Sequence, residues 1–164
     1  MFPAVSREKS GRGNHKMEKE VLIHVRGLQM ADAQDEQEPI EMIVPGEYYL
    51  RNGSHYLRFE ERMEDFDQPT VNYIKVSDKG LEVRKKGLVN VHMVFEHGKK
   101  NMTYYTTPFG TIQMGISATG MKIQEENDSL LVNVDYALDM NEEHVADCYL
   151  SIHAQSKHAG NFAL

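Results

Sequence analysis

The sequence of 164 residues contains one cysteine, no tryptophan and five prolines. The lone cysteine, Cys148, cannot form a disulfide within the chain, and this favours a reducing compartment. Apolar runs are far shorter than the ~20 residues that a membrane-spanning helix needs, and the first residues lack the continuous apolar stretch of a secretory signal. We therefore expect a cytoplasmic protein without a membrane partner.

Motifs of common catalytic and metal sites are absent as well. The sequence has no GxSxG motif, no glycine-rich phosphate loop and no HExxH motif. Its eight histidines have no metal-ligand spacing, and His92 and His153 alternate with apolar residues, which predicts solvated strand faces. Cys148 falls in an apolar row, so we interpret it as a small buried hydrophobe. The sequence thus predicts no metal, no cofactor and no catalytic residue.

The chain also lacks a helical pattern of useful length. Apolar residues instead alternate with polar ones, the period of a strand with one buried face, in nine or ten segments joined by short turns. The cleanest apolar rows lie at residues 89–95 and 130–138. The predicted strands are 19–29, 40–50, 55–63, 71–76, 81–85, 89–96, 102–107, 111–118, 130–138 and 144–154.

The turn between residues 107 and 110 has the clearest local signal. Thr107 opens it, Pro108 fixes φ at the first central position, and Gly110 is free to adopt a positive φ and form a glycine bulge. Asn52-Gly53 predicts a second, two-residue hairpin loop. At Pro45-Gly46, the missing backbone donor predicts a bulge, a bend or a break in the strand.

These strands predict an all-β fold. Sequential antiparallel strands leave two unpaired sheet edges, which proteins remove by closing the sheet into a barrel or folding it into a sandwich. Successive hairpins with one apolar face favour an antiparallel up-and-down β-barrel of about 8–10 strands. The interior of such a barrel is filled by side chains or leaves room for one small ligand.

The two ends of the chain differ from this pattern. Residues 1–16 contain four cations, one anion and almost no apolar periodicity, so we expect a disordered N-terminal extension. Met17 stands directly before the first strand and is an alternative start of the chain. We expect residues 17–156 to form a single β-barrel domain and residues 157–164 to form a disordered C-terminal tail.

The charge of the predicted domain argues against one class of partner. The whole chain has a formal net charge of −7, and without the basic extension, 14 cations and 24 anions remain, a net charge of −10. An acidic body repels phosphate backbones and anionic membranes at long range. We therefore expect no nucleic-acid partner.

Five short motifs follow one another in a recognisable order. Phe59-Glu60-Glu61 comes after a hairpin, and the sequences RKKG at 84–87, MVF at 93–95, TPFG at 107–110 and YAL at 136–138 follow it. In this order they resemble the YwiB-like family of small bacterial proteins, over about residues 17–156. The resemblance implies a calycin-like (lipocalin-like) β-barrel in the bacterial cytoplasm, and it supplies no activity and no catalytic residues.

One carboxylate has an unusual predicted position. Alternation places Glu61 on the same inward face as Leu57, Phe59 and Met63. A lone buried charge destabilises a fold by several kcal/mol, so Glu61 needs a cationic partner or must be protonated. The solvent-facing neighbour in this interpretation is Glu60.

Three cations are candidates to neutralise Glu61. Lys85 and Lys75 qualify by alternation, and Arg84 qualifies if the strand register shifts by one residue. Tyrosine hydroxyls inside a barrel also need hydrogen-bond partners. The tyrosines expected to line the interior are Tyr48, Tyr73, Tyr104 and Tyr136.

These polar groups favour a barrel that binds an unknown small molecule in its interior. A non-catalytic module that binds a protein partner or a second copy of the chain is the alternative. The third interpretation is an enzyme that uses inward carboxylates with raised pKa values. The candidate ligand-binding residues are Glu61, Lys85, Arg84, Tyr104 and Tyr136.

Overall fold

Strands joined by short turns make up most of the computed structural model, which describes residues 6–9, 17–27 and 41–158. These ranges contain no helix, and thus none that could span a membrane. The strands are β1 (Ser6–Lys9), β2 (Glu20–Arg26), β3 (Glu41–Arg51), β4 (Ser54–Glu61), β5 (Thr70–Ser77), β6 (Gly80–Gly87), β7 (Val91–Phe95), β8 (Lys100–Thr107), β9 (Gly110–Glu125), β10 (Ser129–Met140) and β11 (Glu143–Ser156).

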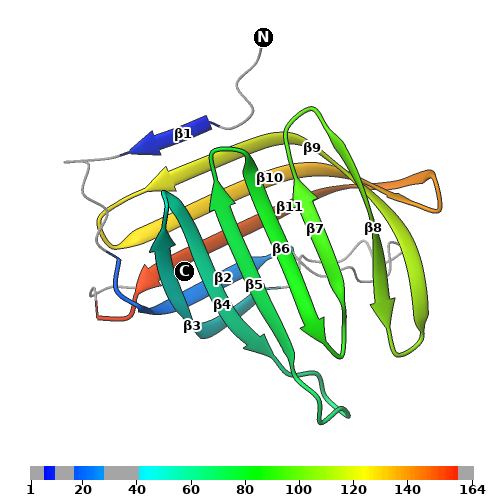
Figure 1. The fold of residues 1–164 in the computed structure, drawn as a ribbon, viewed down its shortest axis with the longest axis horizontal. Helices are drawn as coiled ribbons and strands as arrows, with labels where there is room; N and C mark the ends of the chain where they lie inside the picture. Colours follow the sequence, from blue (N-terminus) through cyan, green and yellow to red (C-terminus); the bar gives the residue numbers. More distant parts are fainter. Residues whose placement is uncertain (1–5, 10–16, 28–40, 159–164) are drawn as a thin grey trace.

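The strands from β2 to β11 form a nearly closed antiparallel barrel. Their order in the sheet is β9-β10-β11-β2-β3-β4-β5-β6-β7, and β8 pairs with β9. Strands β4 to β7 cross in front of β9 to β11 at a steep angle (Figure 1). The seam lies between β7 and β8, where Asn90 and Thr106 exchange two backbone hydrogen bonds of 2.9 Å. This architecture confirms the predicted fold class.

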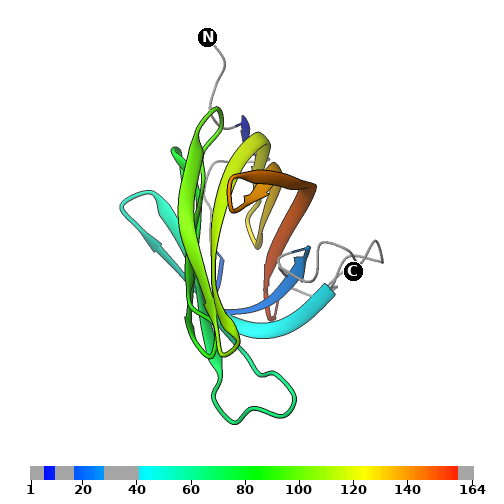
Figure 2. The ribbon, with the colours of Figure 1, turned by 90° about the vertical axis from the view of Figure 1, so that its right-hand side faces the viewer.

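Strand β3 turns the corner between the two crossing layers. It pairs with β2 as far as Glu47 and with β4 from Glu47 onward. Pro45 and Gly46 directly precede this change of partner, and the strand curves strongly there (Figure 2, cyan). A Cβ on Gly46 would lie 2.6 Å from the Arg58 carbonyl oxygen, so the site requires glycine. Of the three predicted alternatives, the structure has a bend within one continuous strand.

The apolar rows identified by alternation form the core of the barrel. Val91, Met93 and Phe95 of β7 are at most 5% exposed, and the ring of Phe95 packs edge-on against Tyr136 of β10 with centroids 5.0 Å apart. Burial of these rows supplies most of the stabilisation, because apolar surface is removed from water on one face of each strand. Further buried rows include Val21, Ile23 and Val25 of β2 and Leu130, Val132, Val134 and Leu138 of β10.

Both hairpin turns lie where predicted and have the predicted positive φ values, but the register of β8 and β9 continues to Thr107 and Gly110 without the predicted glycine bulge. Gly110 has a φ of 139°, and the Thr107 hydroxyl accepts a hydrogen bond from the Phe109 backbone N–H at 3.1 Å. Asn52 and Gly53 have φ values of 51° and 79°, the two positive values of a type I′ loop. The turn residues therefore fix the register of the strands that they join.

The N-terminal extension contains a strand that was not predicted. β1 pairs in parallel with residues 122–125 at the C-terminal end of β9. This end of β9 pairs with β10 on one side only, so its other side offers backbone groups to any extended segment nearby. The rest of the extension (residues 1–5 and 10–16) and residues 159–164 of the C-terminal tail, all predicted to be disordered, lie outside the described residues.

Candidate functional site

Glu61 points into the barrel from the end of β4, as predicted. Its Oε1 accepts hydrogen bonds from Lys85 Nζ at 2.5 Å and from Asn72 Nδ2 at 2.6 Å. The Glu61 and Lys85 side chains are only 16% and 8% exposed, so the pair is largely removed from water. Burial, and then the charge of Glu61, raise the pKa of Tyr105 on β8. The predicted neutralisation of Glu61 by a neighbouring cation is confirmed, and Lys85 is the partner.

Three residues assigned to this interior cluster lie elsewhere. Met63 follows the end of β4 and is 48% exposed, so it does not continue the inward row. Lys75 and Arg84 stand on the outer faces of β5 and β6, because the inward positions there are Asn72 and Lys85. The predicted register was therefore correct, and the one-residue shift that would have brought Arg84 inward does not occur.

The tyrosines divide between the two faces of the sheet. Tyr48 and Tyr136 are buried, as predicted. Tyr73 and Tyr104 are 43% and 63% exposed, which corrects the prediction that they line the interior. In each case the residue beside it in the sequence takes the inward position, Asn72 in β5 and Tyr105 in β8.

A second buried polar chain crosses the interior. The Tyr48 hydroxyl lies 2.7 Å from His55 Nδ1, and His55 Nε2 lies 2.5 Å from Glu125 Oε1. All three residues are at most 5% exposed. Burial, together with the charge of Glu125, raises the pKa of Tyr48. Strand β9 is not a neighbour of β3 or β4 in the sheet, so this chain joins opposite walls of the barrel.

His55 and Glu125 were not predicted as inward residues, although the alternation of their strands indicates it. His55 continues the period-two row of Leu57 and Phe59, and Glu125 continues the row of Ile123. Each row therefore predicts one inward polar residue at its end. Their pairing across the barrel was not predictable, because it depends on how the sheet closes.

The buried carboxylates do not converge on one reaction site. Glu125 contacts His55, which stands on β4 six residues before Glu61. At ~3.4 Å per residue, this separation places the two carboxylates ~20 Å apart along the strand. Cys148 is half-buried and contacts the Tyr136 hydroxyl, and this partial burial raises the pKa of its thiol. Within the described ranges, no three His, Cys, Asp or Glu side chains are grouped to hold a metal.

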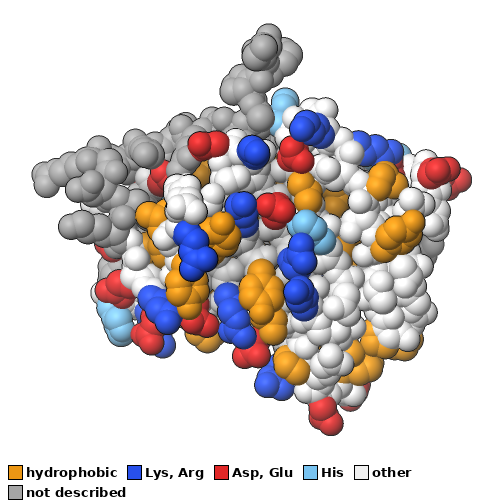
Figure 3. Space-filling model, viewed as in Figure 1, with side chains coloured by type: hydrophobic (Ala, Val, Ile, Leu, Met, Phe, Trp, Pro, Cys, Tyr) orange, Lys and Arg blue, Asp and Glu red, His pale blue; other side chains and the backbone are white. Residues whose placement is uncertain are grey.

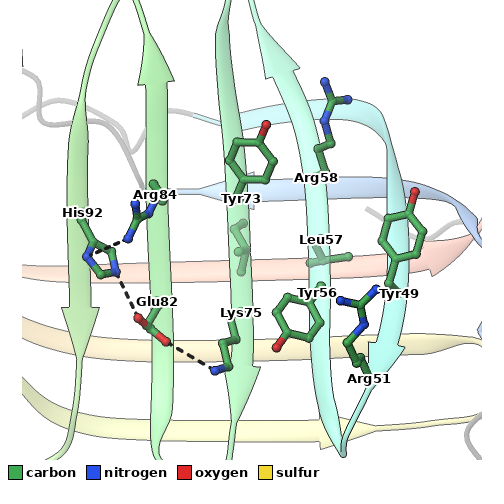
Figure 4. A pocket seen from close by; sticks show the side chains of 11 residues that line it. Tyr49, Arg51, Tyr56, Leu57, Arg58, Tyr73, Lys75, Glu82, Arg84 and His92 are labelled. Carbon is green, nitrogen blue, oxygen red and sulfur yellow. Dashed lines mark hydrogen bonds and ion pairs between the residues drawn. The ribbon is translucent and has the colours of Figure 1, made fainter.

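A groove on the outer face of β3 to β7 is the more promising site. It encloses a cavity of about 460 Å³. Its floor is the strand backbone at Leu57 and Ile74, whose side chains are buried in the core, while its walls carry aromatic and charged side chains (Figure 4). We call this surface the outer groove, and its lining residues are Tyr49, Arg51, Tyr56, Leu57, Arg58, Tyr73, Ile74, Lys75, Glu82, Arg84 and His92.

The sheet register sets these side chains in two rows across the strands. In the first row, Tyr49 of β3 stands opposite Tyr56 of β4, which stands opposite Lys75 of β5 and then Glu82 of β6. The second row passes from Arg58 through Tyr73 and Arg84 to His92. Because directly opposed side chains in a sheet lie about 5 Å apart, each row is a continuous surface.

Cations outnumber anions in the outer groove. Glu82 forms ion pairs with Lys75 at 4.0 Å and, when His92 is protonated, with His92 at 3.0 Å. Arg51 and Arg84 are exposed and form no ion pair with a carboxylate among the described residues. Lysine, arginine and apolar side chains gather over the middle of this face (Figure 3). The groove therefore presents uncompensated positive charge on an acidic protein.

Two of the three tyrosines of the outer groove are exposed, and Lys19 and Lys75 lie over the rings of Tyr49 and Tyr56 at 5.4 and 5.9 Å. Tyr49 and Tyr73 are 42% and 43% exposed, and all three rings turn a face toward the viewer in Figure 4. A hydrogen bond that the Arg58 guanidinium donates to the Tyr73 hydroxyl oxygen, and then the nearby charges of Glu47 and Glu60, raise the pKa of Arg58. Of the predicted candidates, only Arg84 belongs to this groove, because the sequence predictions concerned inward residues and not the outward positions of β3 to β6.

A second cavity marks the corner made by β3. It has a volume of about 440 Å³ and lies beside the bend at Pro45 and Gly46. Arg58 lines both this cavity and the outer groove. The second cavity also includes Glu20, Glu47, Glu60 and Lys157, so its charges are mixed and mostly negative.

Comparisons with known proteins agree with the architecture. The model of a domain of unknown function, DUF1934, matches residues 23–152. The uncharacterized β-barrel protein YwiB of Bacillus subtilis (strain 168) is 25% identical over 128 residues, which cover 78% of this chain and 87% of YwiB. The crystal structure of B. subtilis YwiB matches with a TM-score of 0.69 at 22% identity, over 86% of this chain and 94% of that chain, and this likeness shows the fold alone. The resemblance found in the sequence motifs is confirmed, and the chain belongs to the DUF1934 family of YwiB-like β-barrel proteins.

Proposed function

We propose that this protein is a non-catalytic binding protein that holds a small planar anion of the nucleotide class in the outer groove. The observation that carries the proposal is the set of three tyrosine rings interleaved with four cations around one cavity. Exposed aromatic faces stack on planar rings, and arginine side chains bind phosphate oxygens with paired hydrogen bonds. A nucleotide offers both kinds of group in one molecule.

The outer groove suits a ligand better than the barrel interior does. The interior is filled by large apolar side chains, with Phe59, Phe95 and Met93 at most 1% exposed. Its charged groups are engaged with each other, Glu61 with Lys85 and His55 with Glu125, although the buried Asn72 Oδ1 has no hydrogen-bond partner among the described residues. The groove instead is lined by tyrosine rings together with a few charged groups, and aromatic and placed polar groups are usual in a ligand site. This proposal places the protein in the cytoplasm, where nucleotides are abundant and a single free cysteine remains reduced.

Isothermal titration calorimetry of the full chain tests this proposal with four probes: AMP, UMP, adenosine and inorganic phosphate. AMP and UMP should bind saturably. Adenosine lacks the negative charge and inorganic phosphate lacks the planar ring, so both should bind at least about tenfold more weakly than AMP. Replacing Arg84 by glutamine or Tyr56 by leucine should weaken AMP binding by a similar factor.

Two matched variants control for general effects of charge and aromatic loss. Lys99 is an exposed cation in the turn after β7, and Tyr104 is an exposed ring on β8, and neither lines the groove. Lys99→Gln and Tyr104→Leu should bind AMP as the unmodified chain does. Absence of saturable binding by AMP and UMP, or binding that Arg84→Gln leaves unchanged, would overturn the proposal.

A further inference from the structure

The outer groove is longer than a single nucleotide requires. Its two rows extend across five strands, from β3 to β7, and four strand spacings of ~4.8 Å give a length of ~19 Å. Tyr49 and His92 mark its two ends. A ligand that fills the groove must therefore carry more than one planar ring and more than one negative charge.

Both rows contain rings and cations, and in one of them the two alternate. In one row Arg58 and Arg84 stand on either side of Tyr73, and in the other Tyr49 and Tyr56 are followed by Lys75. A single-stranded nucleic acid repeats the same two groups, because each nucleotide has a planar base and a phosphate. Proteins that bind single strands combine aromatic platforms for the bases with cations along the backbone.

The charge of the whole chain does not govern this surface. The net charge of −10 of the predicted domain, 14 cations against 24 anions, led to the expectation of no nucleic-acid partner. However, the cations that line the groove are Arg51, Arg58, Lys75 and Arg84, and the carboxylates paired with them are Glu82, with Lys75, and Glu47, with Arg58 at 3.3 Å, so the local excess comes from Arg51 and Arg84. Charges separated by more than about 8 Å are largely screened at physiological ionic strength, so the local excess decides what binds here.

We propose that the outer groove binds a short segment of single-stranded nucleic acid, with bases stacked on Tyr49, Tyr56 and Tyr73 and phosphates held by Arg51 and Arg84. This inference rests on the proposed function and extends it from one nucleotide to a strand. A duplex does not suit the site, because its bases are already stacked on one another. An acidic peptide would satisfy the cations and leave the three ring faces unused.

Fluorescence anisotropy of the full chain with labelled 12-mers tests this inference. The probes are oligo-U, oligo-dT, a 12-base-pair DNA duplex and a peptide of 12 glutamates. The two single strands should bind more tightly than the duplex and the peptide, and at least tenfold more tightly than UMP. If Arg51 and Arg84 each contact one phosphate, the logarithm of the binding constant should fall with the logarithm of salt concentration with a slope of about −1.4.

Variants separate the two kinds of contact. Tyr56→Leu and Tyr49→Leu should each weaken oligo-U binding by roughly 5- to 150-fold, the range measured for loss of one stacked base. Arg84→Gln should flatten the salt slope by about 0.7, because one phosphate contact is lost. Tyr104→Leu and Lys99→Gln, which lie outside the groove, should change neither quantity.

The same measurements distinguish failure of the strand inference from failure of the proposed function. If UMP binds in the groove and the 12-mers bind no more tightly, the strand inference is wrong and the proposed function stands. If the glutamate peptide binds more tightly than the oligonucleotides, the groove docks acidic proteins and both proposals are wrong. If the duplex binds as tightly as the single strands, or if Tyr56→Leu has no effect, stacking does not occur and the strand inference is wrong.

Discussion

At the scale of single residues, the interior ion pair makes a sharp prediction. Glu61→Leu should destabilise the fold by about 3 kcal/mol, because it leaves the largely buried ammonium of Lys85 without a counter-charge. Glu60, its neighbour on β4, is exposed, so Glu60→Leu should change the free energy of unfolding by about 0.5 kcal/mol or less. Urea denaturation of the two variants measures the difference.

A double substitution checks the cause. Glu61→Leu combined with Lys85→Met removes both charges, and it should recover most of the stability lost by the single change. Asn72 would then lack the acceptor that Glu61 provides, so recovery should be incomplete. Equal and small effects of Glu61→Leu and Glu60→Leu would show that the pair contributes little.

Single residues were predicted correctly where the residues beside them in the sequence show which face of the strand is inward. Glu61 was identified because a carboxylate interrupts an apolar row, and Lys85 followed from alternation in a nearby strand. Tyr104 was assigned to the wrong face because two adjacent tyrosines occupy β8, and alternation alone does not say which one points inward. The groove residues were passed over because a solvent-facing row of mixed polar residues looks ordinary until neighbouring strands are aligned.

At the scale of secondary-structure elements, two glycines test how turns fix the strands. Gly110 has a φ of 139°, and a Cβ added there would have no atom within 4 Å, so Gly110→Ala strains only the backbone and should destabilise by about 1 kcal/mol. Gly80 has a φ of 145°, and a Cβ there would lie 2.2 Å from the Phe95 carbonyl oxygen. Gly80→Ala should therefore destabilise distinctly more than Gly110→Ala.

Urea midpoints of these two variants and of the unmodified chain provide the measurement. An unchanged midpoint for Gly110→Ala would mean that the β8–β9 turn tolerates an L side chain. A smaller effect at Gly80 than at Gly110 would mean that β6 and β7 separate easily to admit the methyl group. Either result would contradict the view that these glycines are required by their backbone conformation and close packing.

At the scale of the whole molecule, buried tyrosines predict how stability depends on alkaline pH. Burial, and then contact with Cys148, raise the pKa of Tyr136, and burial and Glu125 raise that of Tyr48. In the unfolded chain these phenols ionise near pH ~10. Below that pH their contribution to stability is fully present. Above it the unfolded chain releases protons that the folded chain keeps, so the free energy of unfolding falls as pH rises, by up to about 1.4 kcal/mol per pH unit for each group.

Urea denaturation at a series of pH values from about 9 to about 11.5, which brackets the ordinary phenol pKa, measures this dependence. Tyr136→Phe removes one ionisable group and keeps the ring that packs on Phe95, so the fall in stability above pH ~10 should become less steep. Tyr48→Phe should act in the same direction. A slope that neither substitution reduces would show that these hydroxyls are open to solvent.

The sequence by itself determined the properties that depend on neighbours along the chain. Period-two alternation specified the strands and their inward rows, while turn chemistry at Asn52-Gly53 and Thr107–Gly110 specified which strands are joined and in what register. Together with the short connections, these features were sufficient for the barrel. The tertiary structure decided what lies across the barrel and across its strands: the contact between His55 and Glu125, the pairing of β1 with β9, and the outer groove. Such contacts depend on sheet closure and strand alignment, which bring together residues far apart in the sequence. A local sequence pattern does not predict which of these distant residues meet.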